Sequence, residues 1–191
     1  MRFGARLALC ALAGALIGTG GAVYSVRAGA LGDQIRLGPW TTGRDFGSAR
    51  ASGYTRAVVA LRGLLALPAR EARYYNAAID GAGDPLDGRC TYRLSGGALP
   101  AAWWSVTLYD PAGYLVPNAA NVHSVGSLGL APAEQGRWVV TISPNPAPGR
   151  WLPSGGAGRF ELTLRTYLPA DGGRGEIAGD RLPRIEKLGC A

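Results

Sequence analysis

The pattern of apolar positions begins with an uncharged stretch from Leu7 to Val26, preceded by Arg6 and followed by Arg27. Twenty helical residues span about 30 Å, the thickness of a bilayer's hydrocarbon core. The apolar core of a signal peptide is shorter, roughly 7 to 15 residues. We therefore predict an N-terminal membrane anchor over residues 1–27, with residues 7–26 in the membrane. Ala28-Gly29-Ala30 has the small-x-small form of a cleavage site, so a cleaved signal sequence remains the alternative.

The next apolar pattern has the period of a helix. Tyr54, Val58, Leu61 and Leu65 form one stripe, which Leu64 widens. Ser48 is a candidate N-cap, and Pro68 predicts that the helix ends near Leu67. Between anchor and helix, residues 28–47 are predicted to be an irregular linker, with a turn at Gly38-Pro39-Trp40.

After residue 70 the period changes to two, which is typical of strands. Strands are predicted at 74–79 and 89–94, joined by the turn Asp80-Gly81-Ala82-Gly83-Asp84-Pro85. Three further segments alternate apolar and polar positions: 103–109, 138–142 and 160–165. Several short alternating strands with one preceding helix predict an antiparallel β-sandwich over residues 48–191.

Composition supports this fold and limits the function. The 191 residues contain 30 Gly and 13 Pro, which disfavours a helical bundle. The net charge of +7 comes from 20 basic residues, of which only Lys187 is a lysine. No run of basic residues of the kind that follows a phosphate backbone is present, so nucleic-acid binding is not expected.

Cysteine usage indicates the compartment. Cys10 lies in the apolar segment, and Cys90 and Cys190 are the two outside it. We predict a Cys90–Cys190 disulfide, worth about 4–5 kcal/mol in the chain-entropy model, which implies an oxidising compartment. Two unrelated thiols are the alternative. The basic N-terminus is expected to stay in the cytoplasm, which places the rest of the chain outside it. Arg27 and Arg36 on the far side weaken the charge difference, so this expectation rests partly on the short N-terminal tail.

Few side chains suit catalysis. His123 is the only histidine, so neither a metal site nor a cofactor is predicted. A Ser-His-Asp set can be drawn from Ser105 or Ser124 with His123 and Asp110, but adjacent strand residues point to opposite faces, which separates Ser124 from His123. His123 and Asp110 remain weak catalytic candidates.

A binding platform is the other candidate site. Aromatic and amide side chains that suit a sugar or peptide gather in or beside one strand-loop segment: Trp103, Tyr109, Tyr114, Asn118, Asn121 and His123. The alternative is that the tryptophans are core residues.

The order of motifs in the second half resembles the bacterial family called domain of unknown function 1214. The motifs are Trp103 to Asp110, Asn121 to Gly126, Arg150 to Pro153, and Phe160 to Pro169, with the acidic turn from Asp80 to Gly88 ahead of them. The resemblance covers roughly residues 46–185 and implies a jelly-roll-like β-sandwich. It supplies no catalytic residues. We expect the chain to be a short, membrane-anchored form of the family without the companion domain numbered 1254.

Together these features predict a single-pass protein of the bacterial inner membrane with most of its chain in the periplasm. Its sandwich is expected to bind an envelope protein, a glycan or a lipid without catalysis. An extracytoplasmic hydrolase acting on glycan or ester substrates is the alternative function.

Overall fold

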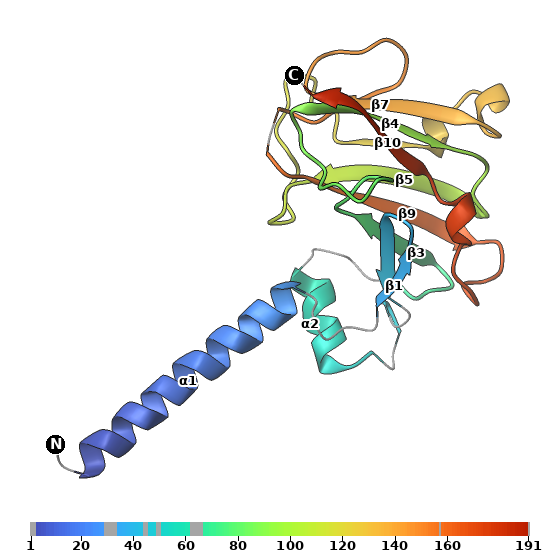
Figure 1. Ribbon diagram of the computed structural model, residues 1–191. Coiled ribbons are helices and arrows are strands. Elements are labelled where there is room, and N and C mark those ends of the chain that lie inside the picture. Colours follow the sequence, from blue (N-terminus) through green and yellow to red (C-terminus); the bar gives the residue numbers. More distant parts are fainter. Residues whose placement is uncertain are drawn as a thin grey trace.

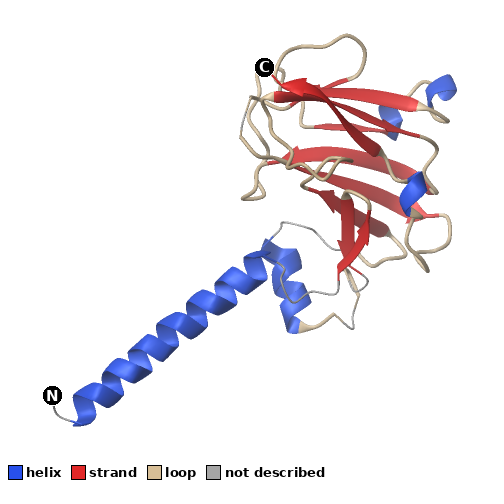
Figure 2. Ribbon diagram, viewed as in Figure 1, coloured by secondary structure: helices blue, strands red, loops and turns tan. Residues whose placement is uncertain are grey.

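The computed structural model describes residues 3–28, 34–43, 46–48, 51–61, 67–156 and 158–190. Two β-sheets pack face to face, and two helices lie at one side of them (Figures 1 and 2). The prediction of a mainly β protein with two sheets, an N-terminal apolar helix and a second short helix is confirmed. The jelly-roll connectivity implied by the family resemblance remains a prediction.

The first helix, α1 (Phe3–Ala28), extends away from the sandwich as a single rod (Figure 1). Its segment Phe3–Val26 is long and apolar enough to cross a membrane, and none of it is buried in the fold. A membrane anchor and a signal sequence both have these properties. Gly29 and Ala30 of the possible cleavage site lie outside the described residues.

The expected irregular linker was wrong for residues 34–43. Strands β1 (Gln34–Leu37) and β2 (Trp40–Gly43) form a hairpin around Gly38 and Pro39. Gly38 has φ of +63°, a conformation that a residue without a side chain adopts without strain. The predicted turn at Gly38-Pro39-Trp40 is therefore present as the turn of a hairpin in the larger sheet. Trp40 itself is fully buried.

The second helix, α2 (Gly53–Leu61), begins later than expected. Ser52, and not Ser48, caps it: the Ser52 hydroxyl accepts a hydrogen bond from the Thr55 backbone N–H at 3.1 Å. Val58 is buried, as the stripe predicts, and Val59, which the stripe did not include, is buried as well. Leu64 and Leu65 lie outside the described residues.

The larger sheet has six strands in the order β1-β2-β3-β9-β5-β6. The other four are β3 (Ala72–Ala77), β5 (Ala101–Tyr109), β6 (Ser124–Gly126) and β9 (Glu161–Pro169). All its neighbouring strands are antiparallel. Val59 of α2 packs with Ala72 and Tyr74 of β3, so the helix covers part of this sheet's outer face.

The smaller sheet has four strands in the order β10-β4-β7-β8. They are β4 (Cys90–Gly96), β7 (Trp138–Ser143), β8 (Trp151–Pro153) and β10 (Arg184–Cys190). The β7–β8 pair is parallel, which the expectation of a purely antiparallel sandwich missed. Short 3-10 helices occupy Ser127–Gly129, Pro132–Glu134 and Gly179–Arg181.

The predicted disulfide is present. Cys90 and Cys190 are directly opposite each other in the β4–β10 ladder, and the bond joins the start of β4 to the end of β10. It closes a loop with a sequence separation of 100 residues.

The core lies between the sheets and follows the predicted alternation. Trp104, Val106 and Leu108 of β5 are buried there. Trp104 stacks on Trp138 of the opposite sheet, with ring centroids 4.4 Å apart. The expected polar face of β5 differs in one respect: Ser105 and Thr107 are also buried, because the outer face of this sheet is partly covered.

Candidate functional site

The loop between β5 and β6 holds most of the predicted platform residues, and its hydrogen bonds are largely internal. Asp110 Oδ1 accepts hydrogen bonds from the backbone N–H groups of Ala112 and Tyr114, at 2.9 and 2.8 Å. Asn118 donates to the Val122 carbonyl at 2.9 Å and accepts from the Val122 N–H at 3.1 Å. These two polar side chains therefore shape the loop backbone.

His123 belongs to the same internal network. Its Nδ1 lies 3.3 Å from Asn118 Nδ2, and its Nε2 lies 3.2 Å from Asn121 Oδ1. Within the described residues neither ring nitrogen meets a carboxylate, so Asp110 does not orient the imidazole as a catalytic pair requires. Nor do these residues bring together three His, Cys, Asp or Glu side chains that could hold a metal ion.

The aromatic members of the predicted platform are not brought together. Trp103 and Tyr109 are six residues apart on β5, a separation of about 20 Å along a strand. Trp103 packs on Tyr167 at a centroid distance of 4.6 Å. The Tyr109 hydroxyl accepts a hydrogen bond from Arg165 at 3.0 Å. Tyr114 is 72% exposed. The Asp110 N–H donates to its carbonyl at 2.8 Å, next to the bridge between Tyr109 and Leu115, but among the described residues the Tyr114 ring stacks on no other aromatic ring. Asn118, Asn121 and His123 alone form one group.

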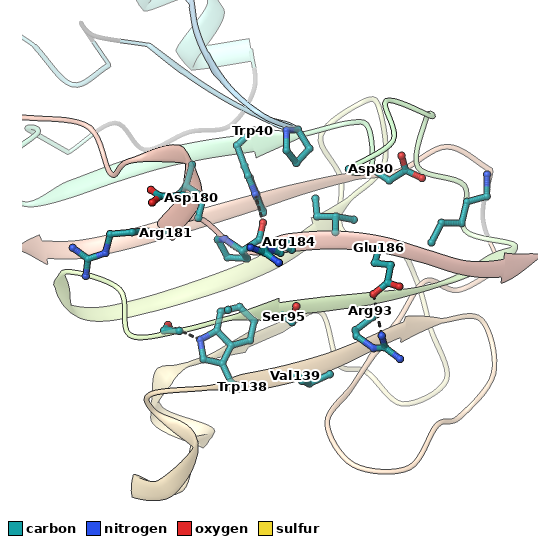
Figure 3. A pocket seen from close by; sticks show the side chains of 18 of the residues that line it. Trp40, Asp80, Arg93, Ser95, Trp138, Val139, Asp180, Arg181, Arg184 and Glu186 are labelled. Carbon is teal, nitrogen blue, oxygen red and sulfur yellow. Dashed lines mark hydrogen bonds and ion pairs between the residues drawn. The ribbon is translucent and has the colours of Figure 1, made fainter.

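A groove elsewhere on the molecule is the more extensive candidate site. It has a volume of about 1410 Å³ and follows β10, the edge strand of the smaller sheet. One flank is the outer face of that sheet, where Arg93 and Ser95 of β4 lie beside β10 and Val139 of β7 lies beside Ser95 (Figure 3). The other flank contains Trp40 and the turn that begins at Asp80.

Two hydrogen bonds hold β10 between these flanks. The Trp40 indole N–H donates to the Pro183 carbonyl at 2.7 Å, just before the strand begins. The Gly81 backbone N–H donates to the Ile185 carbonyl at 2.8 Å. Ile185 points into the core, whereas every residue from Glu186 to Cys190 is exposed. The far half of β10 therefore presents its side chains to the groove and to solvent.

The groove contains charges of both signs. Arg93 and Glu186 lie on adjacent strands and form an ion pair at 2.9 Å. Lys187 contacts the Asp84 carboxylate at 3.2 Å, and this hydrogen bond raises the pKa of the Lys187 ammonium group. Such mixed charges suit a polar ligand that carries both donors and acceptors more than an apolar one.

Asp80 is the most buried charged residue of the groove lining, with 2% of its surface exposed. Its Oδ1 accepts hydrogen bonds from the N–H groups of Ala82 and Asp84, at 2.9 and 3.0 Å. Its Oδ2 is buried with no hydrogen-bond partner. The predicted acidic turn is confirmed, and the turn positions the backbone that binds β10.

Sequence patterns did not indicate this groove. Its residues come from β2, from the turn that follows β3, and from strands β4, β7 and β10. These elements are distant from one another in the chain. The only local signal is the alternation of charge from Arg184 to Lys187, which is also typical of an ordinary solvated strand. Only the sheet order makes these segments neighbours.

The fold and the groove define a two-sheet β-sandwich protein with one N-terminal apolar helix and one disulfide. The chain belongs to the family described as protein of unknown function DUF1214, whose model matches residues 71–171.

The solved structures similar to it include two bacterial proteins. The VPA0106 protein from Vibrio parahaemolyticus shares 23% identity at a TM-score of 0.58, over 92% of this chain. This chain spans 43% of that protein's length. A putative uncharacterized protein from Burkholderia cenocepacia shares 20% identity at a TM-score of 0.41. The match covers 62% of this chain and 29% of the Burkholderia protein. No curated protein matches the chain. The first similarity supports the fold and carries no activity.

Proposed function

We propose that this protein is tethered in the bacterial inner membrane by α1 and places its sandwich in the periplasm. The Cys90–Cys190 bond supports this location, because disulfides persist in oxidising compartments and are rare in the cytosol. The free Cys10, by contrast, lies within the apolar helix. The tether is supported by the length, composition and exposure of Phe3–Val26.

In this proposal the sandwich is a non-catalytic binding module, and the groove along β10 is its binding site. The exposure of β10 from Glu186 to Cys190 is the observation that carries this function. An exposed edge strand flanked by an open groove is suited to an extended segment of a partner protein, whose side chains alternate along the strand. The Arg93–Glu186 pair supplies charges for such a segment.

Location is tested by membrane fractionation of cells that express the full chain. We expect the protein to resist alkaline extraction, and Cys90 and Cys190 to be blocked against alkylation unless reductant is added. Release of a shortened chain into the soluble fraction would identify α1 as a cleaved signal. Reduced cysteines would place the domain in the cytosol.

Binding is tested in cells with a photo-crosslinking residue at Val139, which is exposed in the groove. We expect a discrete crosslinked protein that is lost in the double variant Arg93→Ala/Glu186→Ala. Arg70→Ala/Glu71→Ala removes an ion pair outside the groove and is the matched control. A crosslinker at Tyr114, which does not line the groove, should give no such product.

The same variants distinguish other ligands. Binding of a glycan or a lipid headgroup to the full chain in detergent stabilises the folded state by about 2.7 kcal/mol at a hundredfold excess over Kd. Such a shift, sensitive to the groove variant, would assign the groove to that ligand instead of a protein. Turnover of a glycan or ester that is lost in His123→Ala would replace the binding proposal with a hydrolase.

A further inference from the structure

The positive charge of the chain is concentrated next to α1. Residues 71–191 carry eleven basic and eleven acidic residues and are therefore neutral. Residues 27–70 carry seven arginines and only two acidic residues, Asp33 and Asp45, a net charge of +5. Arg2 and Arg6 supply the rest of the net charge of +7. The excess is thus confined to both sides of the apolar helix.

The structure brings part of the basic segment to the end of the apolar helix. The Tyr54 hydroxyl of α2 donates to the Ser25 carbonyl at 2.6 Å, and Ser25 Oγ lies 3.1 Å from the same hydroxyl. Ser25 is in the last turn of the apolar stretch, which ends at Val26. The first turn of α2 therefore lies level with the end of the helix that crosses the membrane.

The aromatic residues at this level fit a membrane–water boundary. Tyr24 is 75% exposed, and Tyr54 meets Ser25 one position further on. Tyrosine side chains are enriched at this boundary because the ring is apolar and the hydroxyl is polar. A tyrosine on each helix at the same level places α2 in the headgroup region.

Exposed arginines extend from this level over the adjacent surface. Arg56, two residues after Tyr54, is exposed on α2, and its Nε donates to the Ala51 carbonyl at 3.1 Å. Arg36 is exposed on β1, opposite Thr41 in the hairpin. Thr41 is in turn opposite Asn76 of β3, so these residues share a face of the larger sheet. Tyr74, two residues from Asn76 on that face, contacts α2.

We propose that the juxtamembrane surface, formed by α2 with Arg56 and by the β1–β2 hairpin with Arg36, binds the anionic phospholipid headgroups of the leaflet on the domain's side of the membrane. Guanidinium groups pair with phosphate oxygens through two parallel hydrogen bonds, which suits a surface of phosphate esters. The attraction acts within a Debye length, about 8 Å at physiological salt. Binding holds α2 at the surface, while the smaller sheet lies on the side of the sandwich away from α1 and α2 (Figure 1). This inference rests on the proposed tether.

The test uses the full chain in vesicles of phosphatidylcholine alone or with about one third phosphatidylglycerol. We expect slower amide hydrogen exchange in residues 51–61 and 34–43 in the anionic vesicles, and loss of this protection at high salt. Arg36→Gln/Arg56→Gln should remove most of it, because each arginine near an anionic surface strengthens binding about fivefold. Arg137→Gln/Arg159→Gln removes two exposed arginines of the neutral region and should have no effect.

Equal protection in both vesicles, or no effect of Arg36→Gln/Arg56→Gln, would overturn the inference. If soluble polyglutamate slows hydrogen exchange in a salt-sensitive way and anionic vesicles do not, the juxtamembrane surface binds an acidic protein partner instead. Alkaline extraction of the same vesicles tests the tether separately. If the chain is released, flotation of the released protein with anionic but not neutral vesicles still supports the lipid contact, and failure to float contradicts it.

Discussion

At the scale of single residues, the hydrogen-bond partners decide between a functional and a structural role. His123 and Asn118 have the residue types of a binding site, yet the hydrogen bonds of their side chains are made to atoms of their own loop. The Asn121 backbone adopts φ of +51°, which asparagine tolerates better than most residues. The loop from Asp110 to His123 is therefore held in one conformation largely by its own polar side chains.

A substitution at Asn118 tests this structural role. Asn118→Ala removes the bonds to both backbone groups of Val122, and we expect a loss of about 1–2 kcal/mol in the free energy of unfolding. His123→Ala should cost less, because the asparagines keep the loop closed. Denaturant unfolding of the full chain in detergent measures both. A larger loss for His123→Ala would mean that the imidazole, not Asn118, organises the loop.

Tyr75 gives a prediction about pH. Its hydroxyl accepts a hydrogen bond from the Ile177 N–H at 3.0 Å and lies 3.3 Å from Glu176 Oε2. Burial, aided by the Glu176 charge, raises the pKa of Tyr75 to about 12. The hydroxyl of an unfolded tyrosine has a pKa of about 10. The contribution of neutral Tyr75 to the free energy of unfolding is therefore fully present below that pH. It is lost as the pH rises towards 12.

Tyr75→Phe separates this contribution from those of the other tyrosines. The variant should be less stable at neutral pH by about 1–2 kcal/mol, because the Ile177 N–H loses its acceptor. Its stability should then fall less than that of the natural chain above about pH 10. Thermal unfolding across this range measures the difference. Parallel curves for the two proteins would show that Tyr75 does not titrate as its burial requires.

At the scale of elements, the sequence predicted those features that depend on residues close together in the chain. The alternation in β5 placed Trp104, Val106 and Leu108 in the core, and Val58 of the predicted stripe in α2 is buried. The cap was assigned to the wrong serine, because Ser48 and Ser52 are equally suitable by residue type and only the backbone geometry selects Ser52. β1 and β2 were missed because four-residue strands have too little periodicity to show.

The groove is the clearest example of what could not be predicted. Trp40, Asp80 and Glu186 are far apart in the chain and become neighbours only through the order of strands in two sheets. The buried pair of Arg73 and Glu176 depends in the same way on a contact across a sequence separation of 103 residues. Neither arrangement leaves a periodic signal in the sequence.

The disulfide is predicted to hold the edge strand β10 in place. Apart from Ile185, every residue of β10 is exposed, so side-chain burial retains it only weakly. Cys190→Ser with Cys90→Ser should lower the free energy of unfolding by roughly 4–5 kcal/mol, mainly through the larger entropy of the unfolded chain. Hydrogen exchange should accelerate first in β10. Cys10→Ser is the matched control, and unchanged protection of β10 would show that pairing with β4 suffices.

At the scale of the whole molecule, the charges around α1 leave its orientation finely balanced. Arg2 and Arg6 precede the apolar stretch, whereas Arg27, Arg36 and Arg44 follow it within the range that influences insertion. Arg44 lies outside the described residues. The charge rule alone therefore does not favour the proposed orientation, and the disulfide is the observation that supports it.

This balance predicts that a small change in charge inverts the orientation of the protein in the membrane. Arg2→Gln/Arg6→Gln should turn a fraction of the chains around, so that their domains remain in the reducing cytosol without the Cys90–Cys190 bond. Alkylation of free thiols after denaturation measures that fraction. Arg27→Gln/Arg36→Gln should have the opposite effect and give fully oxidised protein. Full oxidation in both variants would show that other features of the chain fix the orientation.

The covalent link between Cys90 and Cys190 also determines how the protein transmits mechanical force. If the protein is tethered and binds a partner along β10 as proposed, a pull of that partner against the membrane sends tension through the chain from α1 to Cys90, and then across the sulfur bridge into β10. The residues from Thr91 to the start of β10 form the long arm of the closed loop, in parallel with the bridge, and bear almost no load. Only the segment ahead of Cys90, including α2 and β3, can lengthen, so the domain is a tether with a fixed maximum reach.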